Sequence, residues 1–163
     1  MIPRVGIGYD VHPFVDGRPL VLGGETLPGS RGLLGHSDAD ALSHALADAL
    51  LGALALGDLG AHFPDTDPRW KGANSLVLLA QVAAMVHARG YVVGNVDATV
   101  LTEAPKLAPH VDAMRANLAR ALGVEAAQVS VKATRPEGLG SLGKGEGLAV
   151  WAVALLVPRG PAA

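Results

Sequence analysis

Two histidines and one aspartate in the first third of the chain have the clearest potential for metal chemistry. Asp10 and His12 are two residues apart, so their side chains point to the same side of an extended chain. His44 lies in a segment whose leucine spacing predicts a helix. One carboxylate and two imidazoles would leave a zinc-type ion with an open position, the pattern of catalytic sites. The sequence has no cysteine, so a metal site would depend on such groups.

A polar stripe accompanies His44 along the predicted helix. His36, Asp40 and Asp48 are spaced from it at intervals of four residues, which places them on one face of the helix and of the segment before it. Asp40 and Asp48 could orient the His44 ring, but an ordinary solvated helix face is an equally good interpretation. Spacing alone therefore supports a metal site and a structural role equally. The other three histidines are scattered and are interpreted as structural: His62, His87 and His110.

A glycine-rich segment, residues 132–147, is the strongest candidate for binding phosphate. Five of its residues are glycine, so its backbone amides can approach an anion closely. It matches neither the P-loop nor the dinucleotide-binding pattern, and a mobile surface loop is the alternative. Glu137 beside such a cradle favours a bridging Mg²⁺ ion. Ala104-Pro105-Lys106, at the end of a predicted strand, could form a second ligand loop.

Alternating strands and helices must position these groups. Strands are predicted over residues 5–9, 21–22, 95–102, 129–133 and 148–157, and helices from Ser37 or Asp38 to about 57, from 74 to 89 and from 109 to 123. This order predicts a single catalytic domain, residues 1–160, of the α+β class: a small mixed sheet covered by about three helices. The last strand is almost wholly apolar and requires cover on both faces. Self-association and a sheet covered on both sides within one chain explain it equally well.

The bulk composition excludes several classes of protein. Thirteen basic and fifteen acidic residues give a formal net charge of −2, with no basic run, so binding to nucleic acid is not expected. Half of the 163 residues are hydrophobic and 4% are aromatic, which indicates a core of Ala, Val and Leu. No secretory signal precedes Asp10, and the longest apolar run, Leu148 to Pro158, is about half the length of a membrane-spanning helix. No membrane contact and a cytoplasmic location are therefore expected.

Six short motifs occur in the order and spacing of one enzyme family. They are Gly8-Tyr9-Asp10-Val11-His12, His36-Ser37-Asp38-Ala39-Asp40 with His44, Gly57-Asp58-Leu59-Gly60, Phe63-Pro64-Asp65-Thr66-Asp67, Ala104-Pro105-Lys106 and Gly145-Glu146-Gly147. Over about residues 4–157 the chain resembles the 2-C-methyl-D-erythritol 2,4-cyclodiphosphate synthases of the non-mevalonate isoprenoid pathway. The resemblance implies that the 2-phosphate of 4-diphosphocytidyl-2-C-methyl-D-erythritol 2-phosphate attacks the β-phosphorus, CMP leaves and a cyclic diphosphate forms. No protein nucleophile is needed, which agrees with the absence of cysteine and of a Ser-His-Asp arrangement.

The same resemblance implies a role for individual residues. Asp10, His12 and His44 would bind Zn²⁺, or Mn²⁺ or Co²⁺, while Glu137 would contact a Mg²⁺ ion spanning the α- and β-phosphates. The implied catalytic residues are His36, Asp58, Asp65 and Arg135. The implied substrate-binding residues are Asp10, His12, His36, Ser37, Asp58, Leu59, Gly60, Phe63, Asp65, Asp67, Ala104, Pro105, Lys106, Leu107, Ala133, Thr134 and Glu137. The loop from Ala104 to Leu107, with Ala133 and Thr134, would hold cytidine, and a homotrimer would share its sites between subunits.

The chain departs from the family's pattern in two places. Arg135 and Pro136 stand where the family usually has threonines; Pro136 has no amide to donate, while Arg135 adds a guanidinium suited to phosphate. Ser141 and Lys144 replace an aromatic residue and an arginine that line a central cavity in the family's trimer, so the ligand of that cavity is open.

Two other functions are compatible with the residues. In a metal-dependent phosphoester hydrolase, water would replace the internal phosphate as the attacking group, and the products would differ. A non-catalytic nucleotide-binding module would need the loops but not an open metal position. Substitution of His44 by Ala separates these classes, because an enzyme would lose turnover whereas a binding module would keep its ligand.

Overall fold

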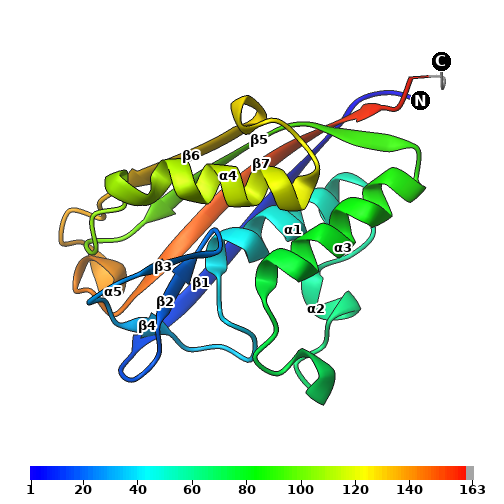
Figure 1. The fold of residues 1–163 in the computed structure, drawn as a ribbon. Coiled ribbons are helices and arrows are strands. Elements are labelled where there is room, and N and C mark those ends of the chain that lie inside the picture. The colour runs from blue at the N-terminus through cyan, green and yellow to red at the C-terminus, as the bar shows by residue number, and fades with distance from the viewer. Residues whose placement is uncertain (161–163) are drawn as a thin grey trace.

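A five-stranded sheet carries three long helices on one of its faces (Figure 1). The computed structural model describes residues 1–160. The strands lie in the order β4 (Gly32–Leu33), β1 (Arg4–Val15), β7 (Gly147–Pro158), β5 (Tyr91–Leu101) and β6 (Val129–Thr134). β5 and β6 are parallel, the other neighbours are antiparallel, and β2 (Leu20–Leu22) pairs with β3 (Glu25–Leu27) in a separate ribbon. The predicted α+β fold with a mixed sheet is confirmed.

The three long helices are α1 (Ala41–Ala53), α3 (Ser75–Ala88) and α4 (Val111–Leu122). Shorter helices are α2 (Leu59–His62) and α5 (Gly140–Gly143), with 3₁₀ turns η1 (Pro68–Trp70), η2 (Ala108–His110) and η3 (Ala126–Gln128). Helix α1 begins later than the expected start at Ser37 or Asp38, because its capping residue is Asp40. The Asp40 side chain accepts a hydrogen bond from the Ser43 N–H. Within residues 1–160, no helix combines the length and apolarity that crossing a membrane requires.

Helix α1 lies directly on strand β1 because two glycines allow it. A Cβ atom at Gly6 or Gly8 would collide with the backbone carbonyl oxygens of Ala49 and Ala45, respectively. Only residues without a side chain let a helix and a strand approach this closely. The contact brings the first turns of α1, which carry His44, against the end of β1.

The opposite face of the sheet is apolar and exposed. We call it the apolar sheet face; its exposed side chains are Val5, Ile7, Tyr9 and Val11 of β1 and Trp151 and Val153 of β7. Along β7 these alternate with buried residues, so the strand has one covered and one uncovered side. The idea that both sides are covered within one chain is wrong, since Trp151 and Val153 are 42% and 44% exposed. Self-association stays a prediction.

Candidate functional site

The three residues expected to bind a metal ion meet where β1 passes α1. One ligand atom from each of Asp10, His12 and His44 lies within 4.8 Å of the other two. Oδ2 of Asp10 is 3.0 Å from Nε2 of His12 and 3.2 Å from Nδ1 of His44. β1 runs on through Asp10 and His12 instead of turning there, so the two side chains project from one face of a regular strand. The donor set fits a divalent ion of the zinc type.

In each of the two histidine rings, the outer nitrogen, which is the one that does not face Asp10, makes hydrogen bonds to other protein groups. Nδ1 of His12 lies 2.6 Å from the carbonyl oxygen of Leu34, and Nε2 of His44 lies 2.8 Å from Oγ of Ser75 and 3.1 Å from Oγ of Ser37. With the outer nitrogen acting as the donor, the lone pair of the other nitrogen faces Asp10. Such outer contacts fix the tautomer and the orientation of metal-binding histidines.

Ser75 and Asp38 form a second layer behind His44. The hydroxyl of Ser75 donates a hydrogen bond to Oδ1 of Asp38, and the Ser75 N–H donates to Oδ2 at 3.1 Å. This arrangement leaves the serine oxygen free to accept the proton of His44 Nε2. Ser75 begins α3, so the packing of α3 against α1 places it here. Residue spacing did not identify Ser75, because it is 31 residues away from His44 in the chain.

Charge is concentrated in this cluster. Burial raises the pKa of Asp10, but hydrogen bonds and charge interactions with His12 and His44 outweigh it and lower the pKa to about 2. Burial lowers the pKa of His12, but its hydrogen bond and charge interaction with Asp10 outweigh it, so the pKa lies above the usual 6.5. The Asp10 carboxylate is therefore ionised at neutral pH and attracts a cation, whether a proton or a metal ion.

Asp40 and Asp48 do not orient His44. The Asp40 carboxylate is fully buried and accepts hydrogen bonds from Ser43 and from the N–H groups of Gly23 and Gly24, which ties the β2–β3 ribbon to α1. Burial raises its pKa although these bonds oppose the effect. Asp48 accepts from the Leu59 N–H at 2.7 Å. Helix α1 begins only at Ala41, so Asp40 caps the helix and does not lie on its face beside His44. Asp48 attaches the loop at Leu59 to the helix.

The metal cluster opens into a cavity of about 640 Å³. Nine expected site residues line it: Asp10, His12, His36, Ser37, His44, Leu59, Gly60, Phe63 and Asp65. Trp70 also lines the cavity and was missed; it packs edge-on against Phe63, with ring centroids 5.1 Å apart. Among the described residues that line the cavity, none is Lys or Arg. A phosphorylated ligand would therefore need cations from elsewhere.

Asp58 and Asp67 stand beside this cavity without lining it. The Asp58 side chain caps α2 by accepting from the Ala61 N–H at 2.8 Å. The Asp67 side chain caps η1 and pairs with Arg69, whose hydrogen bonds lower the pKa of Asp67. Both carboxylates thus support the loop that carries Asp65, whose side chain does line the cavity.

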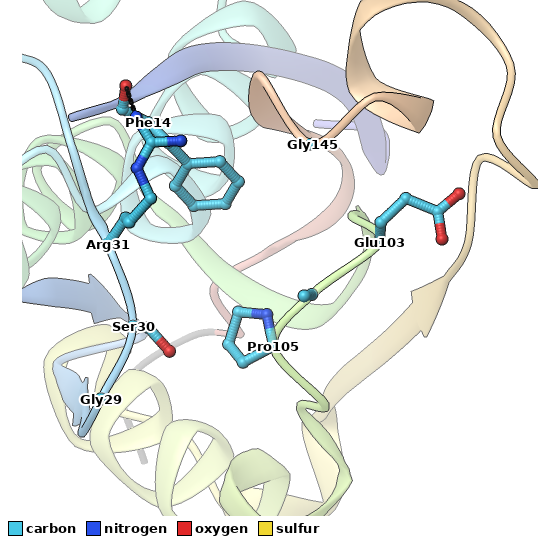
Figure 2. Close-up of a pocket in the computed structure, with 8 residues that line it drawn as sticks. Phe14, Gly29, Ser30, Arg31, Glu103, Pro105 and Gly145 are labelled. Atoms are coloured by element: carbon cyan, nitrogen blue, oxygen red, sulfur yellow. Dashed lines mark hydrogen bonds between the residues drawn. The ribbon is translucent and has the colours of Figure 1, made fainter. Parts of the chain in front are cut away.

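The expected nucleotide and phosphate loops lie in another part of the chain. Ala104 and Pro105 line a second cavity of about 310 Å³, together with Phe14, Arg31 and Glu103 (Figure 2). Of the other expected residues, Lys106, Ala133, Thr134, Arg135 and Glu137 are exposed, whereas Leu107 is 2% exposed and packs in the core. None of them lines the metal cavity of the same chain. Within residues 1–160, the expected site residues therefore fall into two groups, and only one of these groups lines the metal cavity.

Fold and site define an α+β domain with an open Asp/His/His centre at a ligand-sized cavity. Residues 3–157 match the YgbB family, and the chain belongs to that family.

Relatives and solved structures agree with this assignment. The chain is 58% identical over 156 residues to the 2-C-methyl-D-erythritol 2,4-cyclodiphosphate synthase of Trichlorobacter lovleyi, covering 96% of this chain and 99% of the relative. It superposes with a TM-score of 0.91 and 43% identity on the bifunctional IspDF from Campylobacter jejuni, covering 94% of this chain and 42% of that one. A 2C-methyl-D-erythritol-2,4-cyclodiphosphate synthase with CDP bound gives a TM-score of 0.87 at 40% identity, covering 94% of this chain and all of the other.

Proposed function

We propose that this protein is a 2-C-methyl-D-erythritol 2,4-cyclodiphosphate synthase. It converts 4-diphosphocytidyl-2-C-methyl-D-erythritol 2-phosphate to the cyclic diphosphate and releases CMP, as an isoprenoid precursor enzyme. The observation that carries the proposal is the Asp10, His12 and His44 centre on the wall of a cavity of about 640 Å³. Relatives that bear this name share 58–60% identity with the chain over 96% of its length.

The residues of the cavity suit a reaction in which the substrate supplies its own nucleophile. A divalent ion at this centre would polarise the β-phosphate and offset its negative charge. His36 and Ser37 line the same cavity and would position the phosphate, and Asp65 would accept hydrogen bonds from methylerythritol hydroxyls. Asp58 and Asp67 would hold the Asp65 loop. Catalysis would then depend on positioning and charge neutralisation.

The second half of the site would come from a neighbouring subunit. Lys106, Arg135 and Glu137 are exposed and do not line the metal cavity of their own chain, and that cavity has no Lys or Arg among its described lining residues. A homotrimer joined through the apolar sheet face would place these loops over the next subunit's metal centre. They would bring the cytidine contacts, a guanidinium for phosphate and a carboxylate for Mg²⁺.

Product analysis tests this function. With Mg²⁺ and either Zn²⁺ or Mn²⁺, we expect ³¹P NMR to show CMP and a cyclic diphosphate in equal amounts. Inorganic phosphate or a linear product would refute the proposal and indicate a hydrolase. Exhaustive chelation should abolish turnover, and the divalent ions should restore it.

A pair of histidine variants separates catalysis from folding. His44→Ala should lose at least about 100-fold in turnover, because it removes a metal ligand. His87→Ala is the matched control, since His87 is exposed on α3 and lines neither cavity described above. Both variants should bind CDP, because the expected cytidine contacts are elsewhere; loss of CDP binding in His44→Ala alone would contradict this division of the site.

A further inference from the structure

Glu103 connects two loops that do not line the metal cavity, the one that begins at Ala104 and the one that carries Arg135 and Glu137. It follows β5 and precedes the expected ligand loop at Ala104. Its Oε2 accepts a hydrogen bond from Nε of Arg135 at 2.9 Å, and Nη2 of the same guanidinium lies 2.9 Å away. Its Oε1 accepts from the N–H of Gly138 at 2.7 Å. Figure 2 shows this carboxylate directed away from Phe14 and Arg31, which lie across the second cavity.

The contact leaves one edge of the Arg135 guanidinium available. Glu103 engages the Nε and Nη2 side, and within residues 1–160 no hydrogen bond is found for Nη1. A guanidinium has a rigid fork of five donors, so it can hold a carboxylate on one edge and a phosphate on another. The Glu103 side chain is 16% exposed whereas that of Arg135 is 67% exposed. The carboxylate is therefore the fixed partner, and the guanidinium is held at the surface.

The second hydrogen bond fixes the turn that carries Glu137. Glu137 has a φ of +54°, a left-handed conformation that is unfavourable for a residue with a Cβ atom, and Gly138 follows with a φ of +74°. The Glu103 carboxylate holds the N–H of the peptide that joins these two residues. The Gly138 N–H and the Arg135 guanidinium both lower the pKa of Glu103, so it is ionised at neutral pH.

We propose that Glu103 is a positioning residue for the diphosphate of a cytidine nucleotide. It holds the free edge of Arg135 and the carboxylate of Glu137 toward the phosphates. The exposed loop that carries both residues is thereby fixed before the nucleotide binds. The proposal rests on the proposed function and adds a residue that has no direct contact with substrate. It also accounts for the arginine at position 135, because a long side chain without an anchor would lose rotamer freedom when phosphate binds.

A double-mutant cycle tests the coupling. Glu103→Gln keeps an oxygen that can accept from the Gly138 N–H but removes the charge that holds Arg135. We expect kcat/KM to fall about tenfold, the usual order for a charge-assisted hydrogen bond. In an Arg135→Met background the same change should cost less than about twofold, because its partner is already absent. Asp112→Asn is the matched control: it breaks the 3.3 Å ion pair between Asp112 and Arg115 on α4, neither of which lines a cavity described above, and it should leave kcat/KM unchanged.

Two readouts distinguish positioning from stability. The melting temperature should stay nearly constant in Glu103→Gln, since an ion pair with an exposed arginine contributes little to folding. Calorimetric titration with CDP and Mg²⁺ should show the same coupling between Glu103 and Arg135 without turnover. Equal effects of Glu103→Gln with and without Arg135, or full kcat/KM in Glu103→Gln, would overturn the proposal. If the wild type released no CMP, the proposed function would fail instead, and the CDP titration would still decide the role of Glu103.

Discussion

At the candidate metal centre, each histidine ring is held by a hydrogen bond at the nitrogen that does not face Asp10. Leu34 holds His12 through its carbonyl oxygen, and Ser75 holds His44 through a hydroxyl that is itself bonded to Asp38. A carboxylate behind a serine increases the ability of that serine to accept a proton, which favours the His44 tautomer with a free Nδ1. The geometry of the centre is therefore set before any ion binds.

Ser75→Ala should weaken metal binding without unfolding the protein. Loss of its hydroxyl frees the His44 ring to rotate, and we expect an affinity for Zn²⁺ or Mn²⁺ lower by about 10- to 100-fold, measured by calorimetry. Ser43→Ala is the matched control, because Ser43 is equally buried and bonds to Asp40 instead. Equal metal affinities in both variants would show that the Asp38–Ser75 layer has no influence on the centre.

Metal affinity should increase with pH. The pKa of Asp10, about 2, keeps it ionised at all relevant pH values, so it contributes no pH dependence. The pKa of His12 is raised above 6.5 by Asp10 despite the opposing effect of burial, and its proton must leave before Nε2 can bind a metal ion. Below that pKa the affinity should rise about tenfold per pH unit for one released proton. Calorimetry at several pH values and in buffers of different ionisation enthalpy measures it; a flat profile would contradict proton release from His12.

The three residues of the candidate metal centre could be predicted from sequence, but the residues that support them could not. Asp10 and His12 are close in the chain, and His44 stands out on an apolar helix, so residue type and spacing were informative. Ser75 and Trp70 reach the site only through the packing of α3 and the η1 loop. Serine and tryptophan occur in many surroundings, and no local pattern marks these two as site residues. Asp40 could not be assigned from spacing, since an aspartate that caps a helix lies at the same interval from His44 as one that orients its ring.

At the scale of elements, the contact between β1 and α1 determines whether the centre forms. The two backbones touch through Gly6 and Gly8, and this proximity sets the distance from Asp10 to His44. Any side chain between them would move the helix outward. The alternation of glycine with exposed apolar residues in β1 therefore serves the site as well as the core.

Gly8→Ala should destabilise the fold and impair the centre together. Its Cβ would collide with the Ala45 carbonyl, and overpacking of this kind costs about 1–3 kcal/mol in the free energy of unfolding. The control is Gly52→Ala on helix α1, the helix that Gly8 contacts. The nearest atom to a new Cβ at Gly52 is the Ile7 oxygen at 3.8 Å. That change should stabilise the protein by about 0.5–1 kcal/mol through helix propensity. Denaturant unfolding measures both; similar values for the two variants would contradict a steric role for Gly8.

Most long elements were predictable, whereas among the short strands and helices only β2 was predicted. Helices α1, α3 and α4 and strands β5 to β7 have enough residues to express a period of 3.6 or 2 or a continuous apolar run. Strands β3 and β4 and helices α2 and α5 have two to four residues and express no period. β1 was underestimated because Asp10, His12 and Pro13 interrupt its apolar residues, although the backbone continues to Val15.

At the scale of the whole molecule, the apolar sheet face and the divided site favour the same assembly. Exposed apolar side chains on two adjacent strands form a contiguous patch, and Tyr9 and Trp151 pack together at its centre with ring centroids 5.0 Å apart. Contiguous patches of this kind usually mark a protein–protein interface. In the trimer proposed above, the patch would be buried, and the loops of one subunit would complete the site of the next.

Ile7→Glu should therefore separate the subunits and abolish activity while each chain stays folded. Ile7 is 69% exposed in the single chain, so a charge there is harmless to the monomer but would be buried in the trimer. Sedimentation at micromolar concentration should show a trimer for the wild type and a monomer for the variant, with unchanged circular dichroism. Val77→Glu is the control: Val77 is 54% exposed on α3, outside the apolar sheet face, and its variant should remain trimeric and active. A fully active monomer in either the wild type or Ile7→Glu would show that one chain completes the site alone, contrary to the division between its two cavities.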